Sequence, residues 1–386
     1  MKKVIFAVGM KKLSLLLSVL LLAALTASAQ EKQPSWLVKT VKSIFQSLTV
    51  PNKTFDSEYV YQTPLKWMVG VETDMIRVGA QLHNDFTVTD LLDEPPTIDR
   101  GTLDIGIRNE PYWKLGLSAA YGSLQLGYGI RLGNKDKKLG TFFSLGKTSS
   151  FYGGHIRYTK IQQYPEGKLK LDGQTTLLDF GSQGEMRNLS IDAFYAFNRH
   201  RFVFTSAYDG RVMQRRSSGS WLVSAKYHWG DFAMDPDDEL WEQLGDRQRY
   251  SNNQLSTGGG YSFNWVPFHH DPADPSSASG LRNLTVNATA LCRISFLNSI
   301  KTEQTTGNVT KKERYRGQVT LSPAFKGGVC YTMGRCNLLA SIEYDRSSFQ
   351  GADSEETDAH DYVRTRVSTK GAFFNLFLEA KVQVRF

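Results

Sequence analysis

Thirteen charged residues stand between apolar neighbours, in stretches where the character of the side chain changes with every residue. Because successive side chains of a strand point to opposite faces of the sheet, these charges share the face opposite the apolar one. Charges of both signs on an enclosed face can pair and fill an interior, or line a water-filled channel that selects small solutes. The residues are Glu72, Asp74, Asp104, Arg108, Asp192, Arg293, Glu343, Asp345, Arg364, Arg366, Glu379, Lys381 and Arg385.

The C-terminal residues show this pattern most plainly. Apolar side chains occupy every even position from Phe374 to Phe386, with mostly polar side chains between them. Such a strand needs an apolar environment on one face and water or ion-pair partners on the other, as in outer-membrane barrels. The alternative is an edge strand of a soluble sandwich. Because Arg or Lys facing lipid near the midplane costs about 2 to 4 kcal/mol, we expect the charges to face inward.

Residues 1–29 have the features of a secretory signal peptide. Basic residues precede an apolar run from Leu13 to Leu25, and Ala27-Ser28-Ala29 supplies a cleavage site. No later stretch has the roughly 20 apolar residues of a membrane-spanning helix, so a membrane-embedded form has to be a barrel. Without the four lysines of the signal peptide, the formal charge falls from +8 to +4. That charge is too small and too scattered to favour nucleic acid.

Stretches of two-residue period, separated by turn residues, predict strands over most of the remaining chain. We expect about 12 strands, with a range of roughly 10 to 14. Besides the C-terminal strand, they lie around residues 103–108, 113–119, 124–132, 139–147, 152–161, 189–197, 202–208, 221–229, 255–265, 284–296, 319–330 and 338–344.

Residues 35–48 carry a helical pattern, with Leu37, Val41, Ile44, Phe45 and Leu48 on one face. An amphipathic helix here would lie on the membrane surface or pack against the barrel mouth. The expected organisation is therefore a signal peptide at 1–29, a periplasmic or interfacial segment at 30–62 and a barrel at 63–386.

Seven histidines leave an enzymatic reading open, because some barrels hydrolyse or modify lipids. Such a site needs a nucleophile within reach of an oriented histidine. The sequence has no G-x-S-x-G elbow and no H-E-x-x-H motif. His269-His270-Asp271 suits a solvated loop better than a metal site, and we expect no cofactor and no metal.

Cys330 and Cys336 flank a predicted hairpin, where opposed positions of an oxidised protein can form a disulfide. Cys292 falls in the apolar phase of its strand and is expected to face lipid.

Five tryptophans fall near the ends of predicted strands. Their amphipathic rings suit the interface between membrane and water, although a sugar-binding platform would use the same residue type. They are Trp67, Trp113, Trp221, Trp229 and Trp265.

The chain resembles the Bacteroides-type exported barrels catalogued only as a domain of unknown function. The stretches that carry this resemblance lie between about Phe55 and the C terminus. The resemblance implies a β-barrel at the outer membrane and no particular activity. The stretches are 112–122 (YWKLGLSAAYG), 134–139 (NKDKKL), 193–198 (AFYAFN), 201–215 and 218–221 (SGSW).

The sequence therefore predicts an all-β protein, an antiparallel transmembrane barrel in the outer membrane of a Gram-negative bacterium. Its expected partners are outer-membrane lipid and the barrel-assembly machinery, without nucleic acid and with no soluble ligand identified. Three functions stay open: a channel or small-solute transporter with a charged lumen, a barrel enzyme that modifies lipid or lipopolysaccharide, and a closed structural or surface-interaction barrel.

Overall fold

The computed structural model describes residues 55–63, 65–90, 97–108, 112–121, 124–132, 141–148, 151–171, 173–210, 212–234, 249–272, 278–306, 309–351, 354–358 and 363–386. All of these belong to one compact unit, Thr54–Phe386. The expected signal peptide and the expected helix at 35–48 lie outside the described residues.

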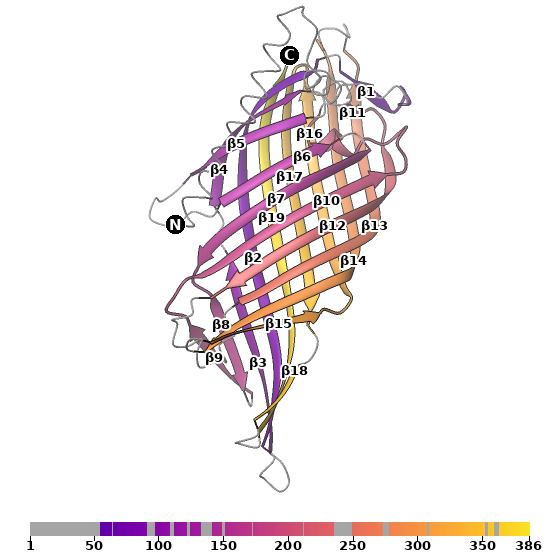
Figure 1. The fold of residues 1–386 in the computed structure, drawn as a ribbon. Coiled ribbons are helices and arrows are strands. Elements are labelled where there is room, and N and C mark those ends of the chain that lie inside the picture. Colours follow the sequence, from indigo (N-terminus) through magenta and orange to yellow (C-terminus); the bar gives the residue numbers. More distant parts are fainter. Residues whose placement is uncertain are drawn as a thin grey trace, which may run out of the picture. The chain divides into compact units, whose positions relative to one another are not determined.

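The described chain consists of antiparallel strands and one short 3-10 helix (Figure 1), which confirms the all-β expectation. The alternation of apolar and polar residues produces strands because only a two-residue period sorts such side chains onto two faces. The elements are β1 Val60–Gln62, β2 Trp67–Asp90, β3 Thr97–Arg108, β4 Tyr112–Tyr121, β5 Leu124–Leu132, β6 Thr141–Thr148, β7 Tyr152–Gln163, β8 Glu166–Leu171, β9 Gln174–Asp179, β10 Gly184–Ala196, η1 Phe204–Ala207, β11 Val212–Gln214, β12 Ser218–Ala233, β13 Arg249–His270, β14 Arg282–Thr306, β15 Val309–Arg316, β16 Thr320–Met333, β17 Cys336–Gln350, β18 Ser354–Asp358 and β19 Val363–Arg385.

Among the described strands, a series of antiparallel pairings returns to the strand from which it starts. It runs β2, β4, β5, β6, β7, β10, β12, β13, β14, β16, β17, β19 and back to β2. One link is much shorter than its neighbours. β5 and β6 share two register pairs, whereas β4 and β5 share nine and β6 and β7 share eight.

Two ends of this sheet are distinguished by their connections. At one end, which we call the proximal end, the first residue of β2 and the last residue of the chain exchange backbone hydrogen bonds, from Trp67 N to Phe386 O and from Phe386 N to Trp67 O. At the opposite, distal end, short strands extend the sheet. β3 pairs with the distal half of β2 and with β8, and β18 pairs with the distal end of β19.

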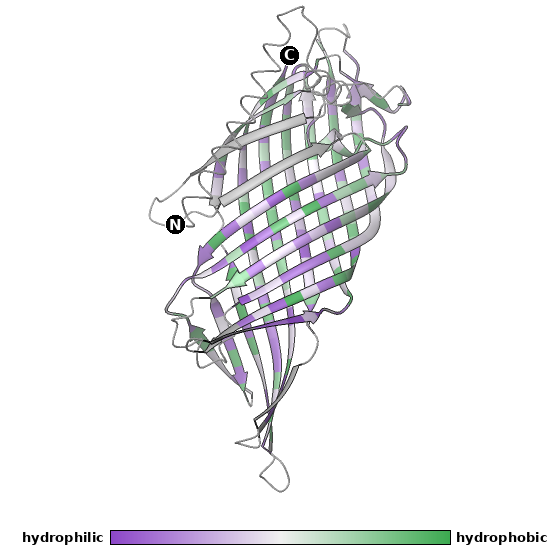
Figure 2. Ribbon diagram, viewed as in Figure 1, coloured by the Kyte–Doolittle hydropathy of each residue, from purple (hydrophilic) through white to green (hydrophobic). Residues whose placement is uncertain are grey.

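Polarity across the proximal sheet is the reverse of that in a water-soluble protein. Along β12, Ser224, Lys226 and His228 are almost fully buried, whereas Trp221 is 67% exposed and Val223 is 42% exposed. The same alternation of polar and apolar residues is visible along this strand in Figure 2. We call the buried face the interior face. Polar side chains therefore meet one another inside, and large apolar side chains point outward.

The distal half of the interior face is apolar instead. A buried cluster there draws residues from nine strands and packs them together, and we call it the apolar layer. It consists of Ile76, Val78, Ala80 and Leu82 of β2, Leu103, Ile105 and Ile107 of β3, Ile161 of β7, Met186 of β10, Phe232 of β12, Tyr250 of β13, Ile300 of β14, Phe349 of β17 and Phe373 of β19, together with Phe180 and Met234.

Candidate functional site

The connection between β10 and β12 folds against the interior face of the sheet. Residues 197–217 contain η1 and β11, and Phe202, Val203 and Ser206 have no exposed surface. We call these residues the plug segment. The sequence predicted a strand at 202–208, and that prediction was wrong, because Phe204–Ala207 form a 3-10 helix whose four residues are all buried.

Hydrogen bonds tie the plug segment to strands on several sides. Asn264 Nδ2 of β13 donates to the carbonyl of Val203 at 2.7 Å. Ser206 Oγ donates to Thr285 Oγ1 of β14 at 3.2 Å, and the Tyr208 hydroxyl donates to a β14 asparagine, Asn287.

A turn completes the attachment of the segment. Arg385 of β19 donates to the carbonyl of Gly210 and, at 2.6 Å, to Asn337 Oδ1 of β17. Gly210 has a φ of +60°, a conformation that glycine adopts without a Cβ clash. β11 also pairs with β1 at the proximal end. Taken together, these contacts place the segment between β13, β14, β17 and β19.

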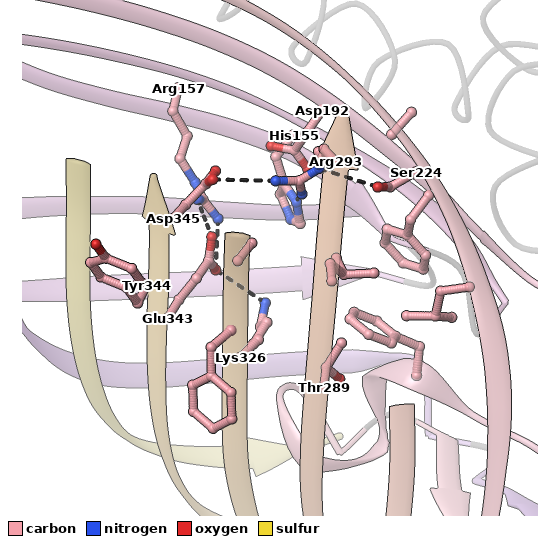
Figure 3. Close-up of a pocket in the computed structure, with 17 residues that line it drawn as sticks. His155, Arg157, Asp192, Ser224, Thr289, Arg293, Lys326, Glu343, Tyr344 and Asp345 are labelled. Carbon is pink, nitrogen blue, oxygen red and sulfur yellow. Dashed lines mark hydrogen bonds and ion pairs between the residues drawn. The ribbon is translucent and has the colours of Figure 1, made fainter. Parts of the chain in front are cut away.

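Along the strands, a layer of ion pairs follows the residues that contact the plug segment and precedes the apolar layer. Arg157 of β7 forms a bidentate pair with Glu343 of β17 (Figure 3), with 2.9 Å between Arg157 Nη2 and Glu343 Oε2. Lys326 of β16 lies 3.4 Å from the same carboxylate and 4.3 Å from the centre of the Tyr208 ring. In the series of pairings, β7 and β17 are six pairings apart in both directions. The Arg157–Glu343 pair therefore joins the interior faces of two strands that lie far apart in the pairing series.

A second group of charges meets at Asp345 of β17. Lys226 Nζ of β12 lies 2.6 Å from Asp345 Oδ2 and donates to Ser347 Oγ at 2.8 Å. Arg293 of β14 binds the other carboxylate oxygen at 3.2 Å and donates from Nε to Ser224 Oγ at 3.1 Å. This group joins β12 and β14 to β17 across the interior.

The space left between these side chains is small. A cavity of about 50 Å³ lies among the charged side chains and is also bounded by the plug residue Phe204 (Figure 3). Because a water needs roughly 10 to 15 Å³ of such volume, this cavity has room for a few water molecules. Its walls are formed by His155, Arg157, Asp192, Ala193, Phe194, Phe204, Leu222, Ser224, Thr289, Leu291, Arg293, Ala324, Phe325, Lys326, Glu343, Tyr344 and Asp345.

Further ion pairs line the interior face near β2. Lys381 Nζ of β19 lies 2.9 Å from Glu72 and 3.7 Å from Glu379. Lys114 of β4 lies 3.1 Å from Asp74 of β2. Charges of both signs are thus paired on this side of the interior as well.

The structure distributes the thirteen charged residues singled out in the sequence over three environments. Glu72, Arg293, Asp345, Lys381 and Arg385 are buried, and Asp74, Asp192, Glu343 and Glu379 are partly buried. The remaining four, Asp104, Arg108, Arg364 and Arg366, are exposed.

On β3 the apolar side chains face inward and the charged ones face outward. Leu103, Ile105 and Ile107 belong to the buried apolar layer, so Asp104 and Arg108 lie on the opposite, exposed face. Arg364 and Arg366 pair with β18 in the distal extension of β19. The expectation that these four residues face inward was therefore wrong.

Sequence reasoning missed one histidine of the charged interior, His155, and three cations, Arg157, Lys226 and Lys326. The signal was present for Lys226, which stands between Ala225 and Tyr227 in the alternating β12 stretch. Nothing in the alternation, however, identifies the carboxylates that these cations meet, because their partners come from strands far away in the sequence.

The expected disulfide is absent. Cys330 and Cys336 are both free thiols, and Cys330 is opposed to Leu339 while Cys336 is opposed to Met333. The tight turn at Gly334 shifts the two cysteines out of register, so they cannot bond across the hairpin. Cys292 is exposed.

A histidine with two carboxylate partners lies in the distal part of the sheet. His83 Nδ1 lies 2.6 Å from Asp104 Oδ1, and His83 Nε2 lies 3.0 Å from Asp85 Oδ1. The hydrogen bond to Asp104 raises the pKa of His83, and the charges of both aspartates add to it against the effect of partial burial. Both ring nitrogens are occupied by these contacts.

The described residues contain no helix that combines the length and the apolar character needed to cross a membrane. They define an antiparallel sheet protein with a charged interior, an inserted plug segment and an apolar outer surface at the proximal end.

The chain belongs to the family described as Domain of unknown function (DUF4421), whose model matches residues 56–368. A comparison with curated proteins finds no match.

Several solved structures share part of the fold. The outer membrane protease OmpT from Escherichia coli matches with a TM-score of 0.37 and 8% identity, over 82% of this chain and 97% of that chain. A loop-deletion mutant of OmpT, an outer membrane protein of Vibrio cholerae, gives a TM-score of 0.24 and 11% identity, over 78% and 99%. The toluene transporter TodX of P. putida gives 0.18 and 7%, over 84% and 91%. All three TM-scores lie below 0.5.

Proposed function

We propose that this protein is an integral β-barrel of a bacterial outer membrane, with an interior closed to solutes and a function carried by its exposed surface. The observation that carries this proposal is the reversed polarity of the proximal sheet. Lys226 and Arg293 are buried there, while large apolar side chains such as Leu117 and Leu321 are more than 60% exposed. In water, this arrangement would cost free energy twice, because apolar surface is exposed and charges lose their solvation. Lipid around the sheet removes the cost of exposing the apolar surface.

The limits of the apolar outer surface support a membrane of ordinary thickness. On β4, exposed Leu115 and Leu117 lie between Trp113 and Tyr121, whose rings suit the two interfaces. The nine residues from Trp113 to Tyr121 agree with the roughly 9 to 11 residues of a tilted transmembrane strand. On β2, the outward-facing side chains change from Val69 and Val71 to polar ones beyond this level.

The pairing series supports a barrel of twelve strands, since a returning series leaves few open strand edges in lipid. On this proposal, the proximal end faces the periplasm and the distal strands extend outside the cell. The signal peptide predicted at 1–29 would direct export, and the barrel-assembly machinery would insert the chain with outer-membrane lipid around it.

Three successive obstacles support a closed interior. The plug segment occupies the proximal end, the ion pairs of Glu343 and Asp345 bridge the middle, and the apolar layer fills the distal half. A passive channel needs a continuous aqueous path, and the cavity of about 50 Å³ accommodates only a few waters. The geometry therefore favours the closed surface-interaction barrel over the open channel in this conformation.

The membrane part of the proposal is tested by fractionation. The mature protein should remain in the outer-membrane pellet after washing with urea or carbonate, and should require detergent for extraction. Recovery of folded protein among the soluble periplasmic contents would overturn it.

The closed interior is tested by conductance. Purified, folded protein in a planar bilayer should give no current above the lipid background, with protein-free detergent as the control. Stable stepwise currents from the folded protein would overturn the closed interior and leave the membrane location standing.

A further inference from the structure

The proximal end of the sheet carries a ring of exposed basic side chains. Within the described residues of this end, six basic side chains are exposed, whereas only two acidic ones, Glu58 and Asp271, are exposed. We call these basic residues the proximal basic rim. They are Lys66, Arg199, Arg201, Arg216, Arg282 and Arg335.

The few acidic groups of the proximal end are already engaged. Arg216 lies 3.1 Å from Glu58, and Arg215 lies 2.5 Å from Asp271. The carboxylate of Asp56, which is partly buried, lies 3.1 Å from Arg201.

Three cations of the rim have no such partner. In the part of the chain that the structure describes, no carboxylate lies within ion-pair distance of Lys66, Arg199 or Arg282. The rim therefore presents uncompensated positive charge to whatever surrounds it. Some exposed cations of the distal end are paired instead, since Arg108 pairs with Glu166 and Lys312 pairs with Glu303.

The position of the three free cations relative to the apolar outer surface indicates their partner. Lys66 directly precedes Trp67, which is 52% exposed, and Arg199 is two residues from Phe197, which is 62% exposed. Arg282 is opposed to His270, two residues beyond exposed Phe268. Aromatic rings of this kind lie at the level of lipid headgroups, so each cation lies beside the phosphates of the same leaflet.

We propose that the proximal basic rim binds the headgroups of anionic phospholipids through Lys66, Arg199 and Arg282. This inference rests on the proposed membrane location and adds a lipid class to it. The shared chemistry is a phosphate anion held by ammonium and guanidinium groups next to an aromatic belt. Each basic side chain near an anionic membrane surface strengthens binding to that surface by about fivefold. The three side chains together therefore strengthen binding by about a hundredfold at most.

The experiment uses the mature full chain refolded into phosphatidylcholine vesicles that contain a small fraction of brominated phosphatidylglycerol. Bromine quenches tryptophan, and Trp67, Trp221 and Trp265 are exposed near the proximal strand ends. Tryptophan quenching by brominated phosphatidylglycerol should be several-fold stronger than quenching by the same fraction of brominated phosphatidylcholine. It should also weaken as salt is added, because the contact is electrostatic.

Two triple variants separate a local site from general charge. K66Q/R199Q/R282Q should lose the preference for phosphatidylglycerol. The matched variant R100Q/K168Q/K170Q removes the same charge from exposed residues of the distal strands β3 and β8, and it should keep the preference. An equal loss in both variants, or equal quenching by the two lipids with the unmodified chain, would overturn the inference.

Inorganic phosphate distinguishes the two sources of the anion. The preference should persist when millimolar inorganic phosphate is added. Its abolition would show that the rim binds free phosphate and would overturn the lipid assignment. Insertion is measured separately by the heat-dependent gel mobility of folded barrels. Failure to insert refutes the membrane location, whereas insertion without lipid preference refutes only the rim.

Discussion

Replacing Glu343 by Gln removes the carboxylate that bridges opposite sides of the interior. The amide keeps the size of the side chain and loses its charge. Arg157, whose side chain is 14% exposed, then loses its bidentate partner. Lys326 loses its carboxylate at 3.4 Å and keeps the ring of Tyr208 at 4.3 Å.

The magnitude follows from the geometry. At 2.9 Å and an effective dielectric constant of about 20, the attraction between unit charges is about 6 kcal/mol. Part of that attraction only offsets desolvation of the two ions, and breaking one partner of a buried pair typically costs about 3 to 5 kcal/mol. The side-chain amide oxygen of the substituted glutamine can still accept one hydrogen bond. We therefore expect E343Q to lower the free energy of unfolding by about 3 kcal/mol.

The measurement is urea-induced unfolding of the protein in lipid vesicles, followed by tryptophan fluorescence. The matched control is E303Q, which makes the same change in the Glu303–Lys312 pair, where Lys312 is 68% exposed. That pair should contribute less than about 1 kcal/mol.

A double variant completes the test. R157M/E343M replaces the bridging pair by apolar side chains of similar length. It should be closer in stability to the unmodified chain than E343Q is, because the buried Arg157 charge is removed together with its partner and Lys326 keeps the ring of Tyr208. If E343Q costs no more than E303Q, the bridging pair is not desolvated and the reasoning is wrong.

Four further results are expected. Leu117→Arg, on the outer face midway along β4, should destabilise the folded protein by about 2 to 4 kcal/mol in vesicles, whereas a change within about 0.5 kcal/mol would indicate a surface in water. In an NMR titration, the midpoint of His83 should lie above the ordinary value of about 6.5, and it should be lower in Asp104→Asn. Because the pKa of His83 is raised in the folded protein, the His83–Asp104 pair stabilises the fold below the unfolded pKa. This stability is lost as pH rises through the folded pKa. An unchanged midpoint in the variant would contradict this assignment. Gly210→Ala should destabilise the folded protein by about 1 to 2 kcal/mol or more in urea unfolding. The reason is that the φ of Gly210 is +60° and a Cβ there would lie 2.9 Å from Asn337 Nδ2. Unchanged stability would rule out this turn. Backbone amides of β5 and β6 should exchange with deuterium faster than those of β13 and β14, because the β5–β6 link has two register pairs; equal protection would show a continuous ladder.

The alternation of residues predicted the strands of the proximal sheet well, because lipid-like and polar surroundings impose a strict two-residue period. Lys226, Arg293 and Asp345 face inward, as the phase of their apolar neighbours requires. The same rule failed at Asp104 and Arg108. If the protein lies in a membrane as proposed, the outer face of a strand passes from lipid to water along its length. Polar side chains then point inward in the proximal part and outward in the distal part, while the alternation keeps its two-residue period.

The plug segment was not visible in the sequence for a different reason. Residues 202–208 contain three aromatic rings and two alanine or valine side chains, a composition that suits a strand. Their conformation is set instead by Asn264, Asn287 and Arg385, whose side chains provide hydrogen bonds from strands far along the chain.

The sequence by itself determined an antiparallel all-β chain in which one face of each proximal strand is apolar and the other carries charge. Local periodicity is sufficient for that, because each strand's alternation is written within ten or so consecutive residues. Only the tertiary structure decided that the charged face is bridged by Arg157–Glu343 and by the ion pairs of Asp345, and that the plug segment packs against it. Those contacts join strands up to 186 residues apart, and no local pattern specifies which cation meets which carboxylate.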